Sequence, residues 1–186
     1  MRVYLSLFFA LTLTFTLFEK NDDSNKNELS ILTSLKSENR LSYNESLNKW
    51  TELKIANGNS YIYQTTFLSW AGFGSTTKLK VIDGKVKARG YQEFRADEQT
   101  GERIITDSYD ENEDELGSHE KGASPLTIDK LYSSCASDYL VVDKEKNTLY
   151  FETEINGLMT LCGFVPNGCA DDCYQGISID SFEWVN

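Results

Sequence analysis

Four cysteines, Cys135, Cys162, Cys169 and Cys173, are the residues whose chemistry the sequence indicates most directly. An even number of cysteines in an exported chain is typical of disulfides, and three pairings are possible. Cys135 follows Ile128 at the i+7 position of a helical period, and Cys162 is expected on the covered face of a strand. We therefore favour Cys135–Cys162, which leaves Cys169–Cys173 to close a small loop. Zinc is the rival, but the spacings are irregular and no histidine is near.

Acidic residues form a second group with possible metal chemistry. Residues 110–115, DENEDE, superficially resemble a calcium loop, but glutamate stands where an EF-hand needs glycine. Asp110, Asp114, Asp171 and Asp172 are therefore only weak Ca²⁺ candidates, and solvated acidic loops are the alternative. We expect no cofactor. A calcium-responsive extracellular protein is the alternative function that these residues leave open.

His119 is the single histidine of the chain. Any Ser-His or Cys-His mechanism would have to use it, and we find no nucleophile paired with it. We therefore assign no catalytic residue. An enzyme is not expected, and a hydrolase is a further alternative.

Aromatic residues surround glycines in the stretch FLSWAGF, residues 67–73. On a loop, Trp70 and Phe73 would form a recognition tip, because aromatic side chains dominate the energetics of interfaces. The alternative is that they cap the core at the end of a sheet. Asn44 begins an Asn-Glu-Ser sequon, which is a glycosylation site only in a eukaryotic secretory pathway.

The elements that position these residues follow from hydrophobic periodicity. Helical spacing predicts one helix over about 42–56, with Trp50 in the core, and a second over 125–140 with Thr127 as N-cap. Alternation around Asp83-Gly84, a strong hairpin signal, predicts a three-strand meander between Tyr61 and Tyr91. Three more strands are expected over 148–154, 158–165 and 176–185. The fold class is α+β: two helix-plus-β-meander units, with the helices packed on one face of an antiparallel sheet.

The N-terminal segment indicates where the protein is located, and the net charge restricts the classes of partner. Residues 1–18 carry the basic start and apolar run of a signal peptide, although an uncleaved anchor is the rival. Residues 19–40 are expected to be a flexible polar segment, and 41–186 a single domain with an acidic loop over 93–124. The net charge of −11 argues against nucleic acid and against anionic lipid. We expect a secreted protein with no membrane association after signal cleavage.

Several short motifs are similar to those of an uncharacterised secreted-domain family, known mainly from bacteria. The shared features are a Trp-bearing helix, a Tyr-x-Tyr strand, a DGKV hairpin, a TIDxL(F/Y) helix, a glycine-containing turn and an Asp pair. Here they are Trp50, Tyr61–Tyr63, Asp83–Val86, Thr127–Tyr132, Asn156-Gly157 and Asp171-Asp172. The turn departs from the family's Gly-aromatic-Pro pattern, since Leu158-Met159 follows Gly157. The resemblance implies export and this fold but no activity. The sequence thus predicts a disulfide-stabilised, non-enzymatic binding domain for an unknown extracellular protein or ligand.

Overall fold

Two helices line the core of the protein, for which we describe a computed structural model over residues 30–185. Helix α2 spans Tyr43–Asn57. Its N-cap is Ser42, whose side chain accepts from the Glu45 amide while Glu45 reaches back to the Ser42 amide, a complete capping box. Helix α3 spans Ile128–Ser134 with Thr127 as N-cap, and it continues into one π-helical turn, η1, over Cys135–Tyr139. Both predicted helices are therefore present.

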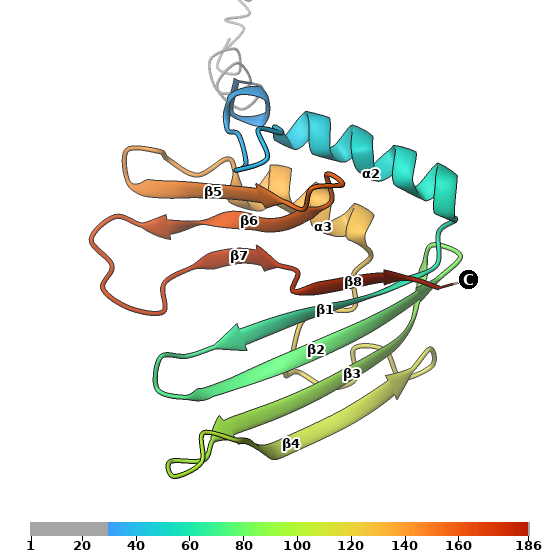
Figure 1. The fold of residues 1–186 in the computed structure, drawn as a ribbon, viewed down its shortest axis with the longest axis vertical. Coiled ribbons are helices and arrows are strands. Elements are labelled where there is room, and N and C mark those ends of the chain that lie inside the picture. The colour runs from blue at the N-terminus through green and yellow to red at the C-terminus, as the bar shows by residue number, and fades with distance from the viewer. Residues whose placement is uncertain (1–29, 186) are drawn as a thin grey trace, which may run out of the picture.

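In the described part of the chain, eight antiparallel strands form two sheets (Figure 1). The larger sheet has the order β4-β3-β2-β1-β8 and the smaller one β5-β6-β7. Their bounds are β1 Tyr61–Leu68, β2 Phe73–Ile82, β3 Lys85–Ala96, β4 Arg103–Asn112, β5 Asn147–Thr153, β6 Met159–Pro166, β7 Gln175–Ser178 and β8 Ser181–Trp184. The molecule is thus mixed α+β, with more strand than helix.

The last predicted strand is divided between the two sheets. Its first half, β7, pairs with β6, and its second half, β8, pairs with β1. Ile179 donates its amide to the carbonyl of Thr160, and Asp180 donates to that of Gln64. The two residues between β7 and β8 therefore connect the sheets.

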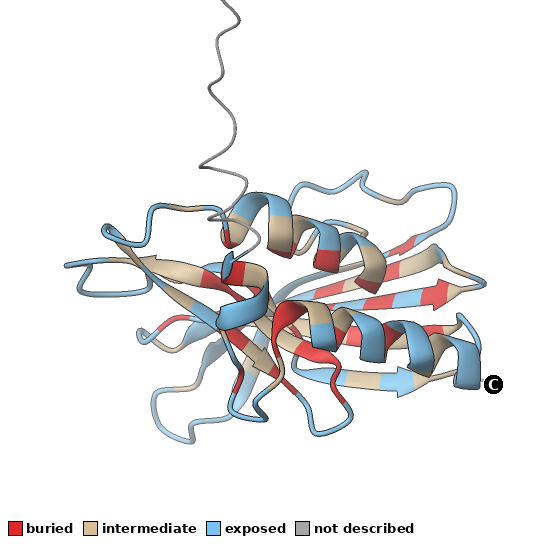
Figure 2. Ribbon diagram, turned by 90° about the horizontal axis from the view of Figure 1, so that it is seen from above, coloured by how far each residue is buried: buried red, intermediate tan, exposed pale blue. Residues whose placement is uncertain are grey.

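The core lies between the helices and the sheet face that carries Tyr61 and Phe151, which we call the inner face. Trp50 of α2 is fully buried and stacks on Trp184 of β8, with ring centroids 5.6 Å apart. The Trp50 ring also meets Tyr61 edge-on. Figure 2 shows the buried residues on the surfaces where helices and strands face each other. Because this core contains several aromatic rings, it removes a large apolar area from water.

The disulfide between Cys135 and Cys162 crosses this core and joins η1 to β6. Both residues are fully buried, and their Cα atoms are 5.7 Å apart. Its position matches the predicted helix-to-strand bond. A second disulfide joins Cys169 to Cys173 in the connection between β6 and β7.

The expected acidic loop over 93–124 is wrong in part. In the polar segment over 19–40, for which the sequence allows at most a short helix over 28–36, the described residues include a helix over 30–34, and both Ile31 and Ser37 are buried. The Ser37 hydroxyl hydrogen-bonds that of Thr153 on β5. Much of the expected acidic loop over 93–124 is strand: β3 extends to Ala96, and β4 follows. The predicted signal peptide lies outside the described residues.

Candidate interaction surface

Four large apolar side chains are exposed together where β1 turns into β2. Their exposed fractions are 77% for Trp70, 61% for Leu68, 52% for Phe67 and 51% for Phe73. Phe67 and Phe73 contact each other, with ring centroids 6.3 Å apart. We call these four residues the apolar tip. The alternative that Trp70 and Phe73 cap the core is wrong, because both rings project into solvent.

The backbone beneath the apolar tip is fixed by short hydrogen bonds. The amide of Ser69 donates to the carbonyl of Phe73 (2.9 Å), and the amide of Gly72 donates back to the carbonyl of Ser69 (3.1 Å). The turn closes through Gly72 at a φ of 81°, a conformation that glycine adopts without steric cost. Ser69 itself is buried, although it lies between exposed neighbours. The tip is therefore held in one place by its turn.

A close contact under the tip adds support. The ring of Phe94 on β3 is buried and lies over Gly74 of β2, so closely that a Cβ on Gly74 would come 2.8 Å from its Cζ. The guanidinium of Arg103 covers the same ring at 4.1 Å. The same Cβ would come even closer to the carbonyl oxygen of Phe67, so a larger residue at position 74 would displace the backbone of β1 as well as Phe94.

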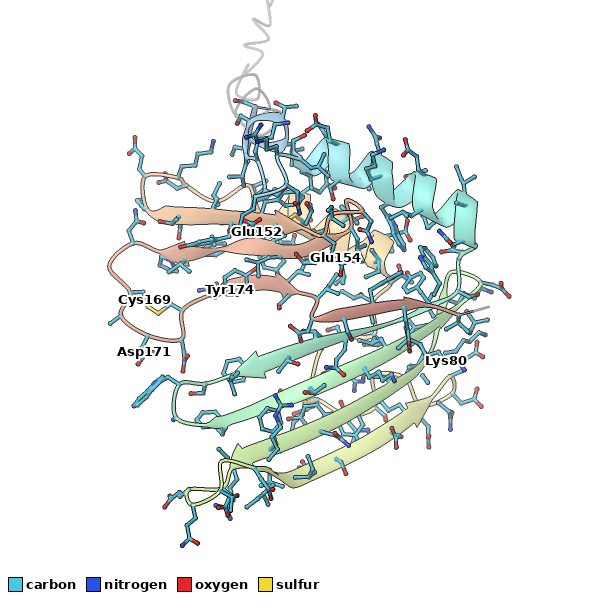
Figure 3. All side chains as sticks on the ribbon, viewed as in Figure 1. Lys80, Glu152, Glu154, Cys169, Asp171 and Tyr174 are labelled. Carbon is cyan, nitrogen blue, oxygen red and sulfur yellow. A yellow bond between two sulfur atoms is a disulfide. The ribbon has the colours of Figure 1, made fainter. Side chains whose placement is uncertain are left out.

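The Cys169–Cys173 loop lies on one side of the apolar tip. The Ser69 hydroxyl donates to the Asp172 carboxylate over 2.9 Å, and this bond joins the hairpin turn to the disulfide-closed loop. Asp171 and Asp172 are both exposed. Figure 3 labels Cys169 and Asp171 in the loop between β6 and β7, at the same end of the molecule as the β1–β2 turn.

The turn between β3 and β4 lies on the other side. The amide of Ala96 donates to the carbonyl of Gly72 over 2.6 Å, which brings residues 97–102 beside the tip. In this turn Asp97 accepts hydrogen bonds from the amides of Thr100 and Gln99, and these bonds lower its pKa. Glu98 and Glu102 are exposed. We call the five carboxylates on the two sides the acidic rim: Asp97, Glu98, Glu102, Asp171 and Asp172.

The other predicted site residues are dispersed. Asp110 lies on β4 and Asp114 in the turn after it, whereas Asp171 and Asp172 lie in the disulfide loop. Over residues 30–185, no group of three or more His, Cys, Asp or Glu side chains is arranged to hold a metal ion. Asn44 lies in the first turn of α2, partly buried.

His119 is fixed in position. Its ring stacks on Tyr109 with centroids 4.0 Å apart, and its Nδ1 lies 3.0 Å from the Glu111 carboxylate. Glu111 is fully buried and bonded to Arg89. The Ser118 hydroxyl lies 3.2 Å from His119 Nδ1, so the expectation that no nucleophile accompanies His119 is wrong. This hydroxyl also donates to the Glu111 carboxylate over 3.3 Å, and Glu111 with Arg89 forms a buried ion pair beneath the loop after β4.

Two shallow hollows on the inner face offer a different kind of surface. One, of about 220 Å³, lies between Tyr63, Leu131 and Tyr139; the other, of about 310 Å³, lies between Phe67, Thr77 and Gly122. Among the described residues, hydroxyl and apolar side chains line both hollows, and no charged residue does. They offer no charged group to orient a small ligand, so the apolar tip is the more distinctive surface.

Comparison with protein-family models, with curated proteins and with solved structures finds no match for this chain. In the described part of the chain, no helix has both the length and the apolar character that a membrane span needs. The surface must therefore be interpreted from its own geometry.

Sequence reasoning found half of the tip and missed its surroundings. The sequence predicts Trp70 and Phe73 as the recognition tip, and Phe67 and Leu68 belong to the same predicted stretch without a role of their own. The acidic rim was missed because its carboxylates are about 70 positions apart in the chain and meet only through Gly72 and Ser69. Asp97 and Gly101, which are residue types common in turns, were the sequence signal for the turn between β3 and β4.

Proposed function

We propose that this protein is an exported, non-enzymatic binding domain that holds its partner through the apolar tip. The observation that carries the proposal is the 77% exposure of Trp70 on a turn whose backbone is fixed on both sides. Single exposed apolar residues are common on protein surfaces, but a contiguous group of large ones is typical of an interaction site.

The composition of the tip fits an interface centre. Tryptophan is among the residues enriched where truncation to alanine costs more than about 2 kcal/mol of binding free energy. Phe67, Leu68 and Phe73 are exposed at the same end of the β1–β2 hairpin and would help to exclude water from that centre. The tip therefore has the residues for a small, tight contact.

Rigidity of the turn supports the same function. A loop that must be ordered on binding loses part of the interaction free energy to conformational entropy. Here Ser69, Gly72 and Ala96 already hold the turn by backbone and side-chain bonds. The partner would meet a preformed surface.

Export is supported by the disulfides. The chain has two disulfide bonds. Disulfides persist in oxidising compartments and are rare in reducing ones. The expected signal peptide points the same way, and an extracellular partner is proposed on this ground.

The test replaces Trp70 and Phe73 together by alanine. Because both side chains are exposed, the melting temperature should stay within about 2 °C of the wild type. As a control, Trp50→Ala should lower the free energy of unfolding by about 3–5 kcal/mol, because Trp50 fills the core. Loss of cooperative melting in the Trp70→Ala/Phe73→Ala variant would show that the tip is structural.

Binding is measured with a displayed library of random peptides selected on the wild-type domain. Peptides that bind the wild type should lose at least about tenfold in affinity for the double variant. Equal affinity for both would place the binding surface elsewhere and overturn the proposal.

A further inference from the structure

The charge around the apolar tip restricts the kind of partner that can approach it. The acidic rim supplies five carboxylates, two on the disulfide loop and three on the β3–β4 turn. Two guanidinium groups, of Arg95 and Arg103, lie at the adjoining strand ends, and Arg103 already covers Phe94. The end of the molecule that presents the tip is therefore net negative.

The carboxylates stand on both sides of the tip. Asp172 is bonded to Ser69 on one side, and Ala96, the residue before Asp97, is bonded to Gly72 on the other. A partner that buries Trp70 must consequently pass between two groups of negative charge. Exposed charges interact over about 8 Å at physiological salt, so the carboxylates act on those parts of a partner that come close to the rim.

We propose that the partner of the tip is a protein with an apolar pocket bordered by lysine or arginine side chains. This inference rests on the proposed function and adds the chemistry of the partner. Basic residues around the pocket would meet the acidic rim as Trp70 enters, which steers the encounter and fixes the orientation. The rim gives specificity, and the apolar tip gives most of the affinity.

Two other occupants are disfavoured by the same charges. A second copy docked through the same tip would bring two acidic rims together, and like charges across an interface repel each other. A bilayer with anionic lipid would repel the rim for the same reason.

The first experiment probes the electrostatic potential around Trp70 in the free protein. The fluorescence of Trp70 is obtained as the difference between the wild type and Trp70→Phe, since Trp50 is buried and Trp184 stacks on it. Caesium should quench this signal better than iodide, each relative to free N-acetyltryptophanamide. In the variant Glu98→Gln/Glu102→Gln/Asp171→Asn the preference should fall by at least about twofold. Equal quenching by both ions in the wild type would overturn the charge argument.

The second experiment uses the library-selected peptides. Peptides that require Trp70 should be enriched in Lys and Arg beside apolar residues. Their affinity should fall at least about tenfold in the rim variant, and it should weaken as salt rises from about 0.05 M to about 0.5 M. A matched control, Asp110→Asn/Asp114→Asn/Glu120→Gln, removes the same charge from β4 and the loop after it and should bind as the wild type does.

The outcomes separate the two proposals. If the peptides need Trp70 but are neutral or acidic, the tip is a binding site and the cationic partner is wrong. If they ignore Trp70, the proposed function itself fails. Binding to phosphatidylcholine vesicles through Trp70, or a dimer in sedimentation that Trp70→Ala dissolves, would replace the cationic protein by a lipid surface or a second copy.

Discussion

The hydroxyl of Ser69 donates a 2.9 Å hydrogen bond to the carboxylate of Asp172, and this bond joins two turns that are 103 positions apart in the chain. Ser69 is buried, whereas Trp70 beside it is the most exposed residue of the tip. Asp172 has a φ of 47°, in the left-handed region that non-glycine residues seldom adopt. The disulfide-closed loop thus presents one carboxylate to the turn and leaves Asp171 to solvent.

Asp172→Ala should loosen the turn. Loss of a hydrogen bond to a charged group costs on the order of 1 kcal/mol at a partly exposed site, so amide exchange at residues 70–72 should rise about fivefold. Asp171→Ala is the matched control, because it removes the same charge from the same loop without touching Ser69. Equal exchange in the two variants would show that the Ser69 bond does not hold the turn.

The two disulfides should contribute unequally to stability. In the chain-entropy model, the Cys135–Cys162 bond, with a separation of 27 residues, is worth roughly 3–4 kcal/mol, and the Cys169–Cys173 bond, with a separation of 4, about 2 kcal/mol. Replacing each pair by alanine and measuring denaturant unfolding tests this order. The loss of Cys169–Cys173 should also accelerate exchange at the β1–β2 turn, and the loss of Cys135–Cys162 should not do so below the global unfolding limit.

Local signals predicted the helices and hairpins well. The helix predicted from about residue 42 begins at Tyr43 with Ser42 as its N-cap, Thr127 caps α3 as expected, and Asp83-Gly84 forms the predicted turn between β2 and β3. Each of these depends on neighbouring residues only. The exposed tip was one of two options, because sequence alone does not show whether Trp70 meets a core.

Strand β4 could not be found in this way because its inner face is polar. Strand prediction relies on alternation of apolar and polar residues, and here Asp107, Tyr109 and Glu111 point to the inner face. Their partners, including Arg89 for Glu111, come from β3 and from the loop after β4. The charge run therefore concealed a strand whose core contact is an ion pair.

Glu111 is the centre of that polar layer. Its carboxylate accepts from Nε and Nη2 of Arg89 at 2.9 and 2.7 Å, and from the amides of Gly117 and His119 at 2.7 and 2.9 Å. Arg89 in turn donates to the carbonyls of Ala123 and His119. Both charged side chains are almost fully buried, with exposed fractions of 2% for Arg89 and 0% for Glu111. One carboxylate thus fastens the loop after β4 to the sheet.

Glu111→Gln should destabilise the protein strongly at neutral pH. It leaves the Arg89 charge buried without its partner, and breaking a buried ion pair in this way costs about 3–5 kcal/mol. Chemical denaturation measures the loss. The double variant Arg89→Met/Glu111→Leu should recover only part of it, because the amides of Gly117 and His119 would still lack an acceptor. Full recovery would mean that the ion pair alone carries the contribution.

The Glu111 carboxylate should also make the free energy of unfolding decrease at low pH. Burial favours the neutral form of Glu111, but the bonds from Arg89 and from the amides of Gly117 and His119 outweigh burial and hold its pKa well below the ordinary value of 4.5. A lowered carboxylate pKa stabilises the folded state fully above the unfolded value, and this stabilisation is lost as pH falls. Other carboxylates, such as Glu45, whose pKa is lowered to about 2 by its bonds from Lys36 and Ser42, act in the same window.

The wild type and Glu111→Gln therefore have to be compared across pH. Their difference in unfolding free energy should be constant above about pH 5 and should shrink below about pH 4.5, by up to about 1.4 kcal/mol per pH unit, because only the wild type takes up the extra proton on unfolding. Glu45→Gln, which lies on α2 far from β4 in the chain, serves as a control for the carboxylates that both proteins share. A difference that stays constant down to about pH 2.5 would mean that Glu111 is not held ionised by Arg89 in the folded protein.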